Sequence, residues 1–325
     1  MTAPTAEQLA DYQILTTGAG LVSLPRTQLA LSGEDRATFL QAFCTGDIKK
    51  LQTGMGCEAF ITNHQGKVAG HVLVFCDADR LLLDGAPGQA EKLIVHLDRF
   101  VISERVEFRD LSTDHAEFLL AGPTSAAVLQ KLNIAPAAER LSHAKVSIGG
   151  EEVSLRTVDL LRVPNFLFSV PATAREVVQR AIVAAGAKVC SEAAFELARL
   201  EAGYPIFGTD ISEENLPQEV QRNTQAISFT KGCYLGQETI ARLDALGHVN
   251  RVLTGLKLPA NHGLAAGATI LQGEKKLAQI TSIGYSPNLG ADLALAYVRT
   301  IHASPGKKLT LASGEAEVIA LPLQN

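Results

Sequence analysis

The pattern of the chain changes near residue 250, and this change constrains the fold more than any other feature of the sequence. Before it, strand-like runs alternate with amphipathic helical runs; after it, the helical period of about 3.6 residues disappears. The remainder of the chain is a series of short β-rich runs separated by glycine-containing turns: Val252–Leu258, Thr269–Leu271, Ala278–Gly284, Leu293–Val298, Lys308–Leu311 and Ala316–Ile319. Short strands without helices predict a small β-barrel or sandwich over residues 250–325.

Residues 1–249 combine strands that pair with their sequence neighbours and helices placed between them. Glu58–Thr62 and Val68–Phe75 flank an Asn63–Gly66 turn, as in a β-hairpin. Further strands are predicted at Leu81–Asp84, Glu104–Arg109, Glu117–Ala121, Lys145–Ile148, Val153–Val158 and Phe166–Val170. Helices are predicted at Ser32–Phe43, Gly88–Phe100, Ser125–Leu132, Arg175–Ala185 and Ala193–Glu201.

Strands that pair locally indicate antiparallel sheets, so we predict an α+β fold rather than a doubly wound parallel sheet. We expect three domains: an α+β region at residues 1–110, a second α+β region at residues 111–249, and the β-barrel at residues 250–325. Gly247–Asn250 is the predicted linker before the barrel.

Composition limits the classes of function that the chain can serve. With 46% hydrophobic and 19% charged residues, it has the balance of a water-soluble globular protein. It contains no apolar run of the roughly 18 residues that a membrane helix needs, and its first residues lack a leader pattern. A net charge of −5 argues against extensive nucleic-acid binding. We therefore expect a bacterial cytoplasmic protein without a membrane partner or a direct nucleic-acid partner.

One cysteine differs from the others in its surroundings. Cys233 lies in the polar, glycine-rich run Lys231–Glu238, which we call the Cys loop. The other cysteines stand among apolar residues: Cys44, Cys57, Cys76 and Cys190. The odd total of five cysteines and the absence of a C-x-x-C pair argue against a disulfide framework and against a self-contained metal or cluster site.

Cys233 has a setting that favours a reactive thiolate. It follows Lys231 by two residues and precedes a predicted helix that begins near Thr239. A helix N-terminus carries about half a positive charge, and this charge and an adjacent ammonium both lower the pKa of a thiol. The alternative is a buried, inert cysteine beside a helix cap, in which Gln237 and Glu238 only complement the helix dipole.

The Cys loop, Lys-Gly-Cys-Tyr-Leu-Gly-Gln-Glu, resembles the signature of the YgfZ family. These folate-binding proteins support iron–sulfur enzymes and tRNA modification, and they are relatives of the glycine-cleavage T-protein, an aminomethyltransferase. Further segments resemble both branches: Gly33–Arg36, Arg199–Asp210, Leu216–Glu219 and Thr281–Pro287. The resemblance covers nearly the whole chain and implies three domains around a central cavity.

The resemblance also implies where a folate would bind. Glu201 matches the carboxylate that holds the pterin edge in the T-protein branch, and Asn63 and Arg199 belong to matching segments. The T-protein hairpin carries a pair of aspartates, one of which assists methylene transfer. The matching positions here are Gly70 and His71, so neither supplies a carboxylate. This difference argues against aminomethyl transfer while leaving a folate cavity in place.

The resemblance thus implies a protein that binds tetrahydrofolate and serves iron–sulfur proteins or their assembly factors. Cys233 and Lys231 would act at the mouth of the cavity, with the thiolate accepting a one-carbon unit, undergoing redox chemistry or ligating a partner's cluster. The supporting loop residues are Gly232, Tyr234, Gly236, Gln237 and Glu238. One cysteine cannot hold a cluster by itself. Two alternatives stay open, a tetrahydrofolate-dependent aminomethyltransferase and a non-enzymatic scaffold with a vestigial cavity.

Overall fold

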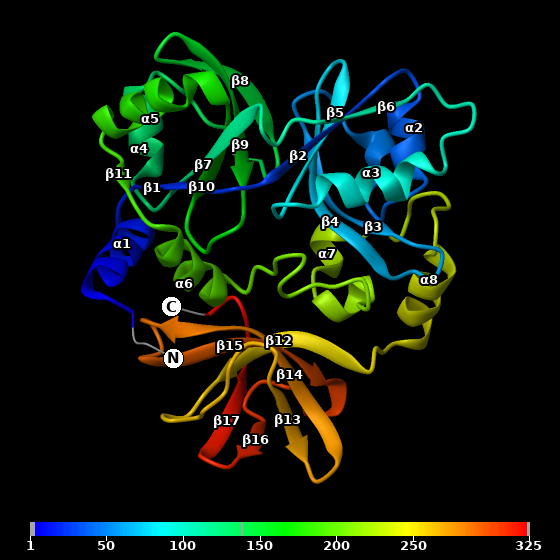
Figure 1. The fold of residues 1–325 in the computed structure, drawn as a ribbon, viewed down its shortest axis with the longest axis vertical. Helices are drawn as coiled ribbons and strands as arrows, with labels where there is room; N and C mark the ends of the chain where they lie inside the picture. The colour runs from blue at the N-terminus through cyan, green and yellow to red at the C-terminus, as the bar shows by residue number, and fades with distance from the viewer. Residues whose placement is uncertain (1–3, 138, 324–325) are drawn as a thin grey trace.

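The computed structural model describes residues 4–137 and 139–323, whose strands form three sheets (Figure 1). Two sheets stand side by side, and the third forms a separate body beneath them. In the described chain, every pairing between named strands is antiparallel except that of β1 (Gly20–Ser23) with β11 (Lys188–Val189). The predicted α+β class with antiparallel sheets and a C-terminal barrel is confirmed.

The first sheet has five strands in the order β3-β4-β5-β2-β6. These strands are β2 (Thr27–Ser32), β3 (Gly56–Thr62), β4 (Val68–Cys76), β5 (Arg80–Gly85) and β6 (Glu107–Asp110). Helices α2 (Arg36–Gln41) and α3 (Ala90–Asp98) cover one face, where Leu29 and Leu31 are buried by the alternation of strand side chains.

The helix predicted from Ser32 begins only at Arg36, because Ser32 ends β2. Gly33 turns the chain there with φ of +97°, and a Cβ at this position would lie 2.0 Å from the Arg105 carbonyl oxygen. Only glycine fits such a position, so the turn separates the strand from the helix.

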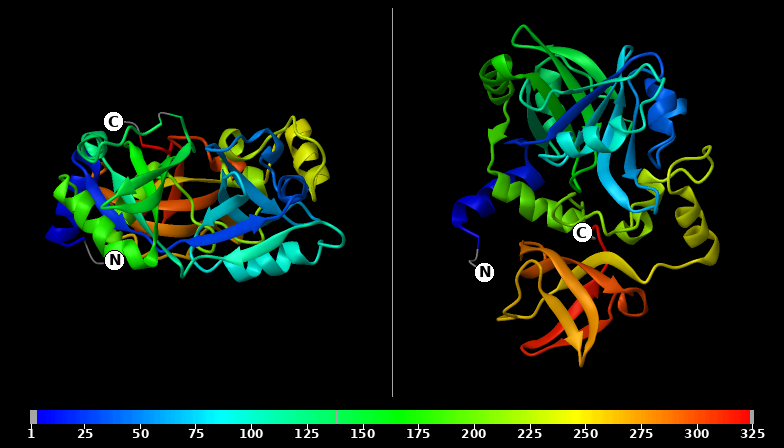
Figure 2. Two further views of the ribbon diagram at one scale, coloured as in Figure 1. Left: turned by 90° about the horizontal axis from the view of Figure 1, so that it is seen from above. Right: turned by 45° about the vertical axis from the view of Figure 1, so that its right-hand side comes forward.

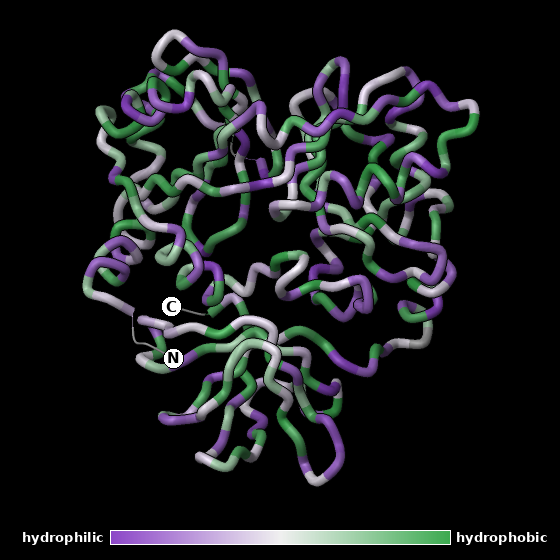
Figure 3. The backbone as a smooth tube through the Cα atoms, in the orientation of Figure 1, coloured by the Kyte–Doolittle hydropathy of each residue, from purple (hydrophilic) through white to green (hydrophobic). Residues whose placement is uncertain are grey.

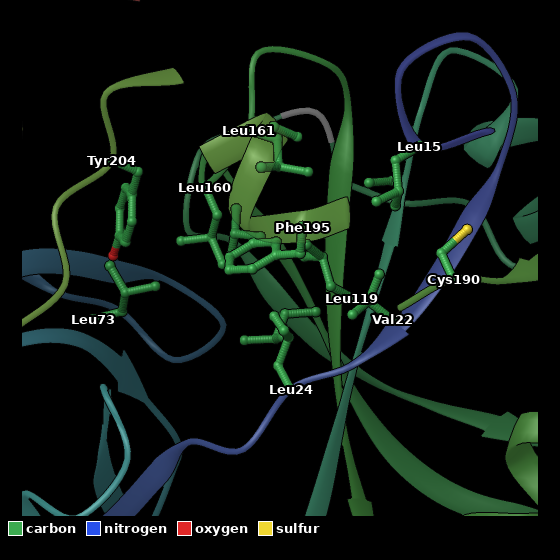
Figure 4. Packing of buried hydrophobic residues seen from close by; sticks show 14 of the residues in the cluster. Leu15, Val22, Leu24, Leu73, Leu119, Leu160, Leu161, Cys190, Phe195 and Tyr204 are labelled. Carbon is green, nitrogen blue, oxygen red and sulfur yellow. The ribbon is translucent and has the colours of Figure 1, made fainter. Parts of the chain in front are cut away.

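The second sheet has six strands in the order β11-β1-β7-β10-β9-β8. Besides β1 and β11 it contains β7 (His115–Ala121), β8 (His143–Ile148), β9 (Glu151–Val158) and β10 (Asn165–Pro171). Helices α4 (Ser125–Lys131) and α5 (Arg175–Ala184) cover one face, and α1 (Ala6–Thr17) and α6 (Glu192–Ala202) cover the other. Figure 4 shows the hydrophobic core between the sheet and helices α1 and α6, where Phe195 of α6 packs near Leu119 and Leu24.

The division of the chain differs from the predicted boundary at residue 110 in two ways. Residues 6–23 belong to the second sheet, because α1 packs on it and β1 pairs with β7. Residues after α6, in contrast, return to the first sheet: the Val68 amide donates to the Asn215 carbonyl at 2.9 Å, and the Ser228 amide donates to the Thr45 carbonyl at 2.9 Å. The Cys loop therefore lies on the first sheet and not on the second region, where the sequence placed it.

The returning segment contains α7 (Asn223–Ala226) and α8 (Gln237–Leu246), and an extended stretch then leads to the barrel (Figure 2). The barrel sheet has the order β13-β14-β15-β12-β17-β16, and its edge strands β13 and β16 contact each other. Its strands are β12 (Arg251–Lys257), β13 (Thr269–Gln272), β14 (Lys275–Ser286), β15 (Ala291–Arg299), β16 (Lys308–Leu311) and β17 (Gly314–Ile319).

Hydropathy follows this arrangement, with hydrophobic residues along the central strands and hydrophilic residues at many of the turns (Figure 3). The longest helix, α1, has 12 residues, and within the described residues no helix is long and apolar enough to cross a membrane.

Candidate functional site

A cavity of about 240 Å³ lies where α6 and the loop after it face the ends of β4 and β5. We call it the central cavity. Its apolar lining includes Leu24, Pro87, Phe195, Tyr204 and Phe207. Its charged and titratable lining comprises Arg26, His71, Glu192, Glu196 and the Tyr204 phenol. Flat aromatic walls with a few polar groups are typical of a small-molecule site.

His71 of β4 borders the cavity and is held by a buried carboxylate. Its Nε2 atom lies 2.7 Å from Glu58 Oε1, and the Phe60 ring stacks on the imidazole at 5.0 Å between centroids. Arg222 and Arg140 bind the same carboxylate. Burial by itself would raise the pKa of Glu58, but the charge and hydrogen bonds of Arg222 outweigh it, with His71 adding to the effect, and hold the pKa well below its ordinary range.

Gly70, the neighbouring position, packs under α3. A Cβ there would lie 2.6 Å from Leu93 Cδ2, and Leu93 is buried in the core of the first sheet. A larger side chain would therefore require Leu93 to move. With Gly70 packed and His71 bound to Glu58, neither position presents a carboxylate to the cavity.

An ion cluster ties the two N-terminal sheets together beside the cavity. Arg26 Nε lies 2.5 Å from Asp84 Oδ1 and 3.3 Å from Glu117 Oε2. Arg156 Nη1 lies 2.5 Å from Asp84 Oδ2 and 2.7 Å from Glu117 Oε1. Burial, followed by the negative charge of Asp84, raises the pKa of Glu117 well above its ordinary value, which favours a protonated Glu117.

Glu196 on α6 is the best-placed carboxylate of the cavity wall. Arg199 holds its Oε2 atom through Nε at 2.9 Å and Nη2 at 2.7 Å. Within the described residues, its Oε1 atom has no hydrogen-bond partner. Arg199 is itself 1% exposed and also binds Asp210 Oδ2 at 2.8 Å. Arg199 therefore holds Glu196 in place, and its role as a direct folate contact stays a prediction.

Glu201, the predicted pterin-binding residue, does not line the cavity. Its Oε1 atom accepts from Ser286 Oγ at 2.5 Å and from the Asn288 amide at 3.2 Å. Its Oε2 atom accepts from Tyr12 Oη at 2.6 Å and from Asn288 Nδ2 at 2.8 Å. A pterin edge would have to displace these donors. The reason is helical geometry, because five residues turn a side chain about 140° around the helix axis from position 196 to position 201.

Asn63 holds the β3–β4 turn. Its Oδ1 atom accepts from the Gln65 amide at 2.9 Å and the Lys67 amide at 3.1 Å. This is the side-chain-to-backbone bonding for which asparagine is favoured in turns. Asn63 borders a different hollow, a groove of about 500 Å³ beside α3 that also includes Lys92 and Arg99. The structure therefore does not bring Asn63 together with Glu196 or Glu201.

Lys231 fixes the Cys loop to the first sheet. Its ammonium donates to the carbonyl oxygens of Gln41 at 2.7 Å, Cys44 at 2.7 Å and Gly46 at 2.8 Å. An ammonium has three protons, so these bonds use all of them. We therefore propose that Lys231 positions the Cys loop, and its predicted role beside Cys233 stays a prediction.

The Cys loop interlocks with the β3–β4 turn. Gly236 has φ of +79°, and a Cβ there would lie 2.3 Å from the Asn63 carbonyl oxygen. Tyr234 is buried, and its amide donates to Gln237 Oε1 at 3.2 Å across the start of α8. Gly232 differs, because a Cβ there would meet nothing within 4 Å. Glu238 is exposed at the first turn of α8.

The thiols differ in their exposure. Cys233 is exposed, whereas Cys44 and Cys190 are buried and Cys57 and Cys76 are partly buried. Burial raises the pKa of Cys44 to about 11 and that of Cys190 to about 11, and it also raises the pKa values of Cys57 and Cys76. Cys233 lies ahead of Gln237, where α8 begins, so the loop and not the helix determines its surroundings. Among the described residues, no group of three or more His, Cys, Asp and Glu side chains is arranged to hold a metal ion.

Comparison with known proteins accounts for nearly the whole chain. The family model described as the GCVT N-terminal domain matches residues 9–229, and the one described as the glycine cleavage T-protein C-terminal barrel domain matches residues 251–323. The chain belongs to the glycine cleavage T-protein family. The division between the two matches coincides with the change of sequence pattern near residue 250. The YgfZ branch within this T-protein family stays a prediction.

Relatives align with most of this T-protein family chain. A chloroplastic protein of Arabidopsis thaliana with a provisional transferase name is 27% identical over 90% of this chain and 68% of its own length. An aminomethyltransferase of Thermus thermophilus is 29% identical over 83% of this chain and 76% of its own. The crystal structure of aminomethyltransferase T of the Bartonella henselae glycine cleavage system has a TM-score of 0.84 at 20% identity, covering 97% of this chain and 89% of that one. That likeness shows the shared fold.

Sequence reasoning missed two contributors to the cavity. Glu196 lies in a run that was recognised as helical, and the spacing of Glu192, Phe195 and Glu196 places these residues on one helix face. This spacing could have identified Glu196 as a candidate site residue. Arg26 gave no such signal, because it stands in the connection between β1 and β2 and only the fold brings it to Asp84.

Proposed function

We propose that this T-protein family member binds a reduced folate, tetrahydrofolate, in the central cavity and supports iron–sulfur proteins through Cys233. The folate assignment rests on one observation. Aromatic side chains line the cavity beside a carboxylate oxygen, Glu196 Oε1, that accepts no hydrogen bond from a described residue. A pterin ring is flat and presents adjacent N–H donors, which a carboxylate accepts well. Phe195 and Tyr204 supply the apolar surfaces.

The volume of the cavity suits the ring of the ligand but not the whole ligand. Sites that enclose a whole drug-sized molecule typically measure roughly 300–1,000 Å³. At about 240 Å³, the central cavity accommodates the bicyclic ring and leaves the p-aminobenzoyl-glutamate tail outside. In this arrangement Glu196 orients the ring, and Arg199 keeps Glu196 in place.

Strand β4, which would lie beside the bound ring, argues against aminomethyl transfer. The resemblance places two aspartates of the T-protein at positions 70 and 71, but Gly70 packs against Leu93 and His71 binds Glu58. Without a carboxylate at these positions, the cavity lacks the group that would assist methylene transfer. We propose that folate is bound here for another purpose.

Cys233 is the second part of the proposal. It is exposed on a loop that Lys231 and Gly236 hold in a fixed position. A single thiolate in such a position can accept a one-carbon unit, exchange with another thiol, or complete the ligand set of a partner's cluster. Any effect on tRNA modification would come from the iron–sulfur enzymes that are served.

A second candidate function is tetrahydrofolate-dependent aminomethyl transfer. The observation in its favour is the name of relatives that align along most of the chain, such as the aminomethyltransferase of Thermus thermophilus. A scaffold without folate is the third alternative.

Calorimetric titration with tetrahydrofolate and an aminomethyl-transfer assay separate these candidates. Saturable one-to-one binding without turnover of aminomethylated lipoyl carrier protein would support the proposal. Turnover of the carrier protein at enzyme-like rates would establish the transferase function. Absence of tetrahydrofolate binding would favour the scaffold function. In cells lacking the native protein, Cys233→Ser should keep folate binding but fail to restore iron–sulfur enzyme activity. Full restoration by Cys233→Ser would contradict the role of the thiol.

A further inference from the structure

A second, polar hollow of about 120 Å³ lies between the two N-terminal sheets, and we call it the intersheet cleft. The ion cluster separates it from the central cavity, since Arg26 borders the cavity, Arg156 borders the cleft, and both bind Asp84 and Glu117. The cleft is therefore a distinct site, and the proposed folate role does not involve it.

Buried donors at the base of the cleft lack good acceptors. Arg156 is 1% exposed, and its Nη1 atom is used by the two carboxylates. Its Nε and Nη2 atoms have only long contacts of 3.4 Å, to Ser154 Oγ and Gln28 Oε1. Hydrogen bonds of this kind normally measure about 2.7–3.2 Å, so these two donors remain poorly satisfied.

Gln28 adds a third donor. It is 1% exposed, and its Nε2 atom has no hydrogen-bond partner among the described residues. Its Oε1 atom accepts from Ser169 Oγ at 2.6 Å and from Arg156, which fixes the orientation of the amide. A buried N–H without an acceptor destabilises the structure, so a ligand that brings an acceptor beside it would be stabilised.

The rim of the cleft carries two cations, and each is paired with one carboxylate. Arg80 Nε lies 3.1 Å from Asp77 Oδ2, and Lys145 Nζ lies 2.9 Å from Glu152 Oε1. Each rim cation is thus balanced by one carboxylate, and the third cation, Arg156, stands behind them. The imidazoles of His115 and His143 also line the cleft. Behind the rim, Arg26 and Arg156 share the carboxylates of Asp84 and Glu117.

We propose that the intersheet cleft binds a small oxyanion through Arg156, Gln28, Arg80 and Lys145. The donors that lack acceptors select an anion over a cation, and the two sheets supply them together. One water occupies roughly 30 Å³ in the liquid, so the cleft has room for about four waters or one five-atom oxyanion. Inorganic phosphate is the matching probe.

The test is a titration of the full chain with inorganic phosphate at constant ionic strength, followed by calorimetry, with chloride as the reference anion. Lys145→Ala should weaken phosphate binding by roughly threefold, the size expected for an exposed charge. Lys308→Ala is the matched control, since Lys308 is 60% exposed and pairs with Glu315 at 2.8 Å, as Lys145 is 62% exposed and pairs with Glu152 at 2.9 Å. The control should bind as the wild type does.

Gln28→Glu should weaken phosphate binding by at least roughly tenfold, because it replaces a buried donor with a negative charge. If Gln28→Glu fails to fold, the rim double variant Arg80→Ala/Lys145→Ala serves in its place, and its affinity for phosphate should fall roughly tenfold. Absence of saturable phosphate binding to the wild type would overturn the proposal. Equal binding by wild type, Lys145→Ala and the second variant would place the anion elsewhere and would also overturn it.

Discussion

At the scale of single residues, the partner of each carboxylate decides whether it is available to a ligand. Glu58 is used by Arg222, Arg140 and His71, and Glu201 is used by Tyr12, Ser286 and Asn288. Only one oxygen of Glu196 is taken by Arg199. A sequence motif indicates that a carboxylate is present, whereas its hydrogen bonds decide what it can bind.

Cys233 should be the first thiol to react with an alkylating agent at neutral pH. It is exposed, whereas burial raises the pKa of Cys44 and that of Cys190 to about 11 each, which keeps both as neutral thiols. Brief treatment with iodoacetamide, read by peptide mass spectrometry, should label Cys233 well before the other cysteines. Equal labelling of Cys233 and Cys190 would contradict this ranking.

Glu58→Gln should destabilise the protein in a pH-dependent way. The pKa of Glu58 is depressed in the folded state, so its contribution is complete above the unfolded value of about 4.3 and is lost as the pH falls below it. Removing a buried charge that has cationic partners should cost about 3–5 kcal/mol near pH 7.

Urea unfolding of the wild type and of Glu58→Gln should therefore show a large difference near neutral pH and a smaller one near pH 3.5. Glu315→Gln, which removes an exposed carboxylate paired with Lys308, is the control and should change little. A difference between wild type and Glu58→Gln that does not vary with pH would show that Glu58 is not ionised in the folded protein.

At the scale of elements, the shape of the Cys loop is set by the β3–β4 hairpin that it packs against. Gly236 approaches the Asn63 carbonyl, the Thr62 hydroxyl donates to the Leu235 carbonyl at 2.7 Å, and Lys231 bonds to the carbonyls that follow α2. Because these contacts join the loop to the first sheet, the first sheet sets where the exposed thiol of Cys233 lies.

Two glycines of the Cys loop provide a matched pair for testing this interlock. Gly236→Ala should destabilise the protein by more than about 2 kcal/mol, since a side chain there meets both a positive φ and the Asn63 backbone. Gly232→Ala meets no neighbouring atom and should stay within about 0.5 kcal/mol of the wild type. Thermal unfolding of both variants measures the difference. Equal stability of the two would mean that the loop does not interlock with the turn.

The sequence could predict the elements whose pattern is strong. The barrel strands, the β3–β4 hairpin and α3 were expected close to their observed bounds, because alternation and helical spacing depend only on neighbouring residues. Helix α1 was missed, since only Tyr12 and Leu15 of its 12 residues are buried and its apolar stripe is weak. The direction of Glu201 could not be predicted either, because Tyr12 and Asn288, which bind it, are distant in sequence.

At the scale of the whole molecule, α6 joins all three sheets. Its Phe195 packs in the core of the second sheet and lines the cavity at the first, and Arg199 reaches Ser282 of the barrel at 3.1 Å. Glu201 binds Ser286 and Asn288, at and just beyond the end of β14. The helix therefore places the cavity wall and anchors the barrel through different faces.

Glu201→Gln should loosen the barrel from α6. The change removes a charged acceptor shared by Tyr12, Ser286 and Asn288, and hydrogen bonds to a charged group are each worth about 1.5–3 kcal/mol. Amide hydrogen exchange should become faster in the last turn of α6 and in the second half of β14. Glu196→Gln, the same change on the same helix, should leave exchange in β14 as it is. Unchanged exchange in Glu201→Gln would contradict the anchoring role.

We propose that a reduced folate binds in the central cavity with its ring against Glu196. The most direct test is a calorimetric titration of tetrahydrofolate into the wild type, Glu196→Gln and Glu201→Gln. Glu196→Gln should weaken binding by about ten- to one-hundredfold, the loss expected for a hydrogen bond to a charged acceptor. Glu201→Gln should bind within about threefold of the wild type and differ in thermal stability instead. The reverse result, with affinity lost in Glu201→Gln and kept in Glu196→Gln, would place the ring at Glu201 and contradict the account.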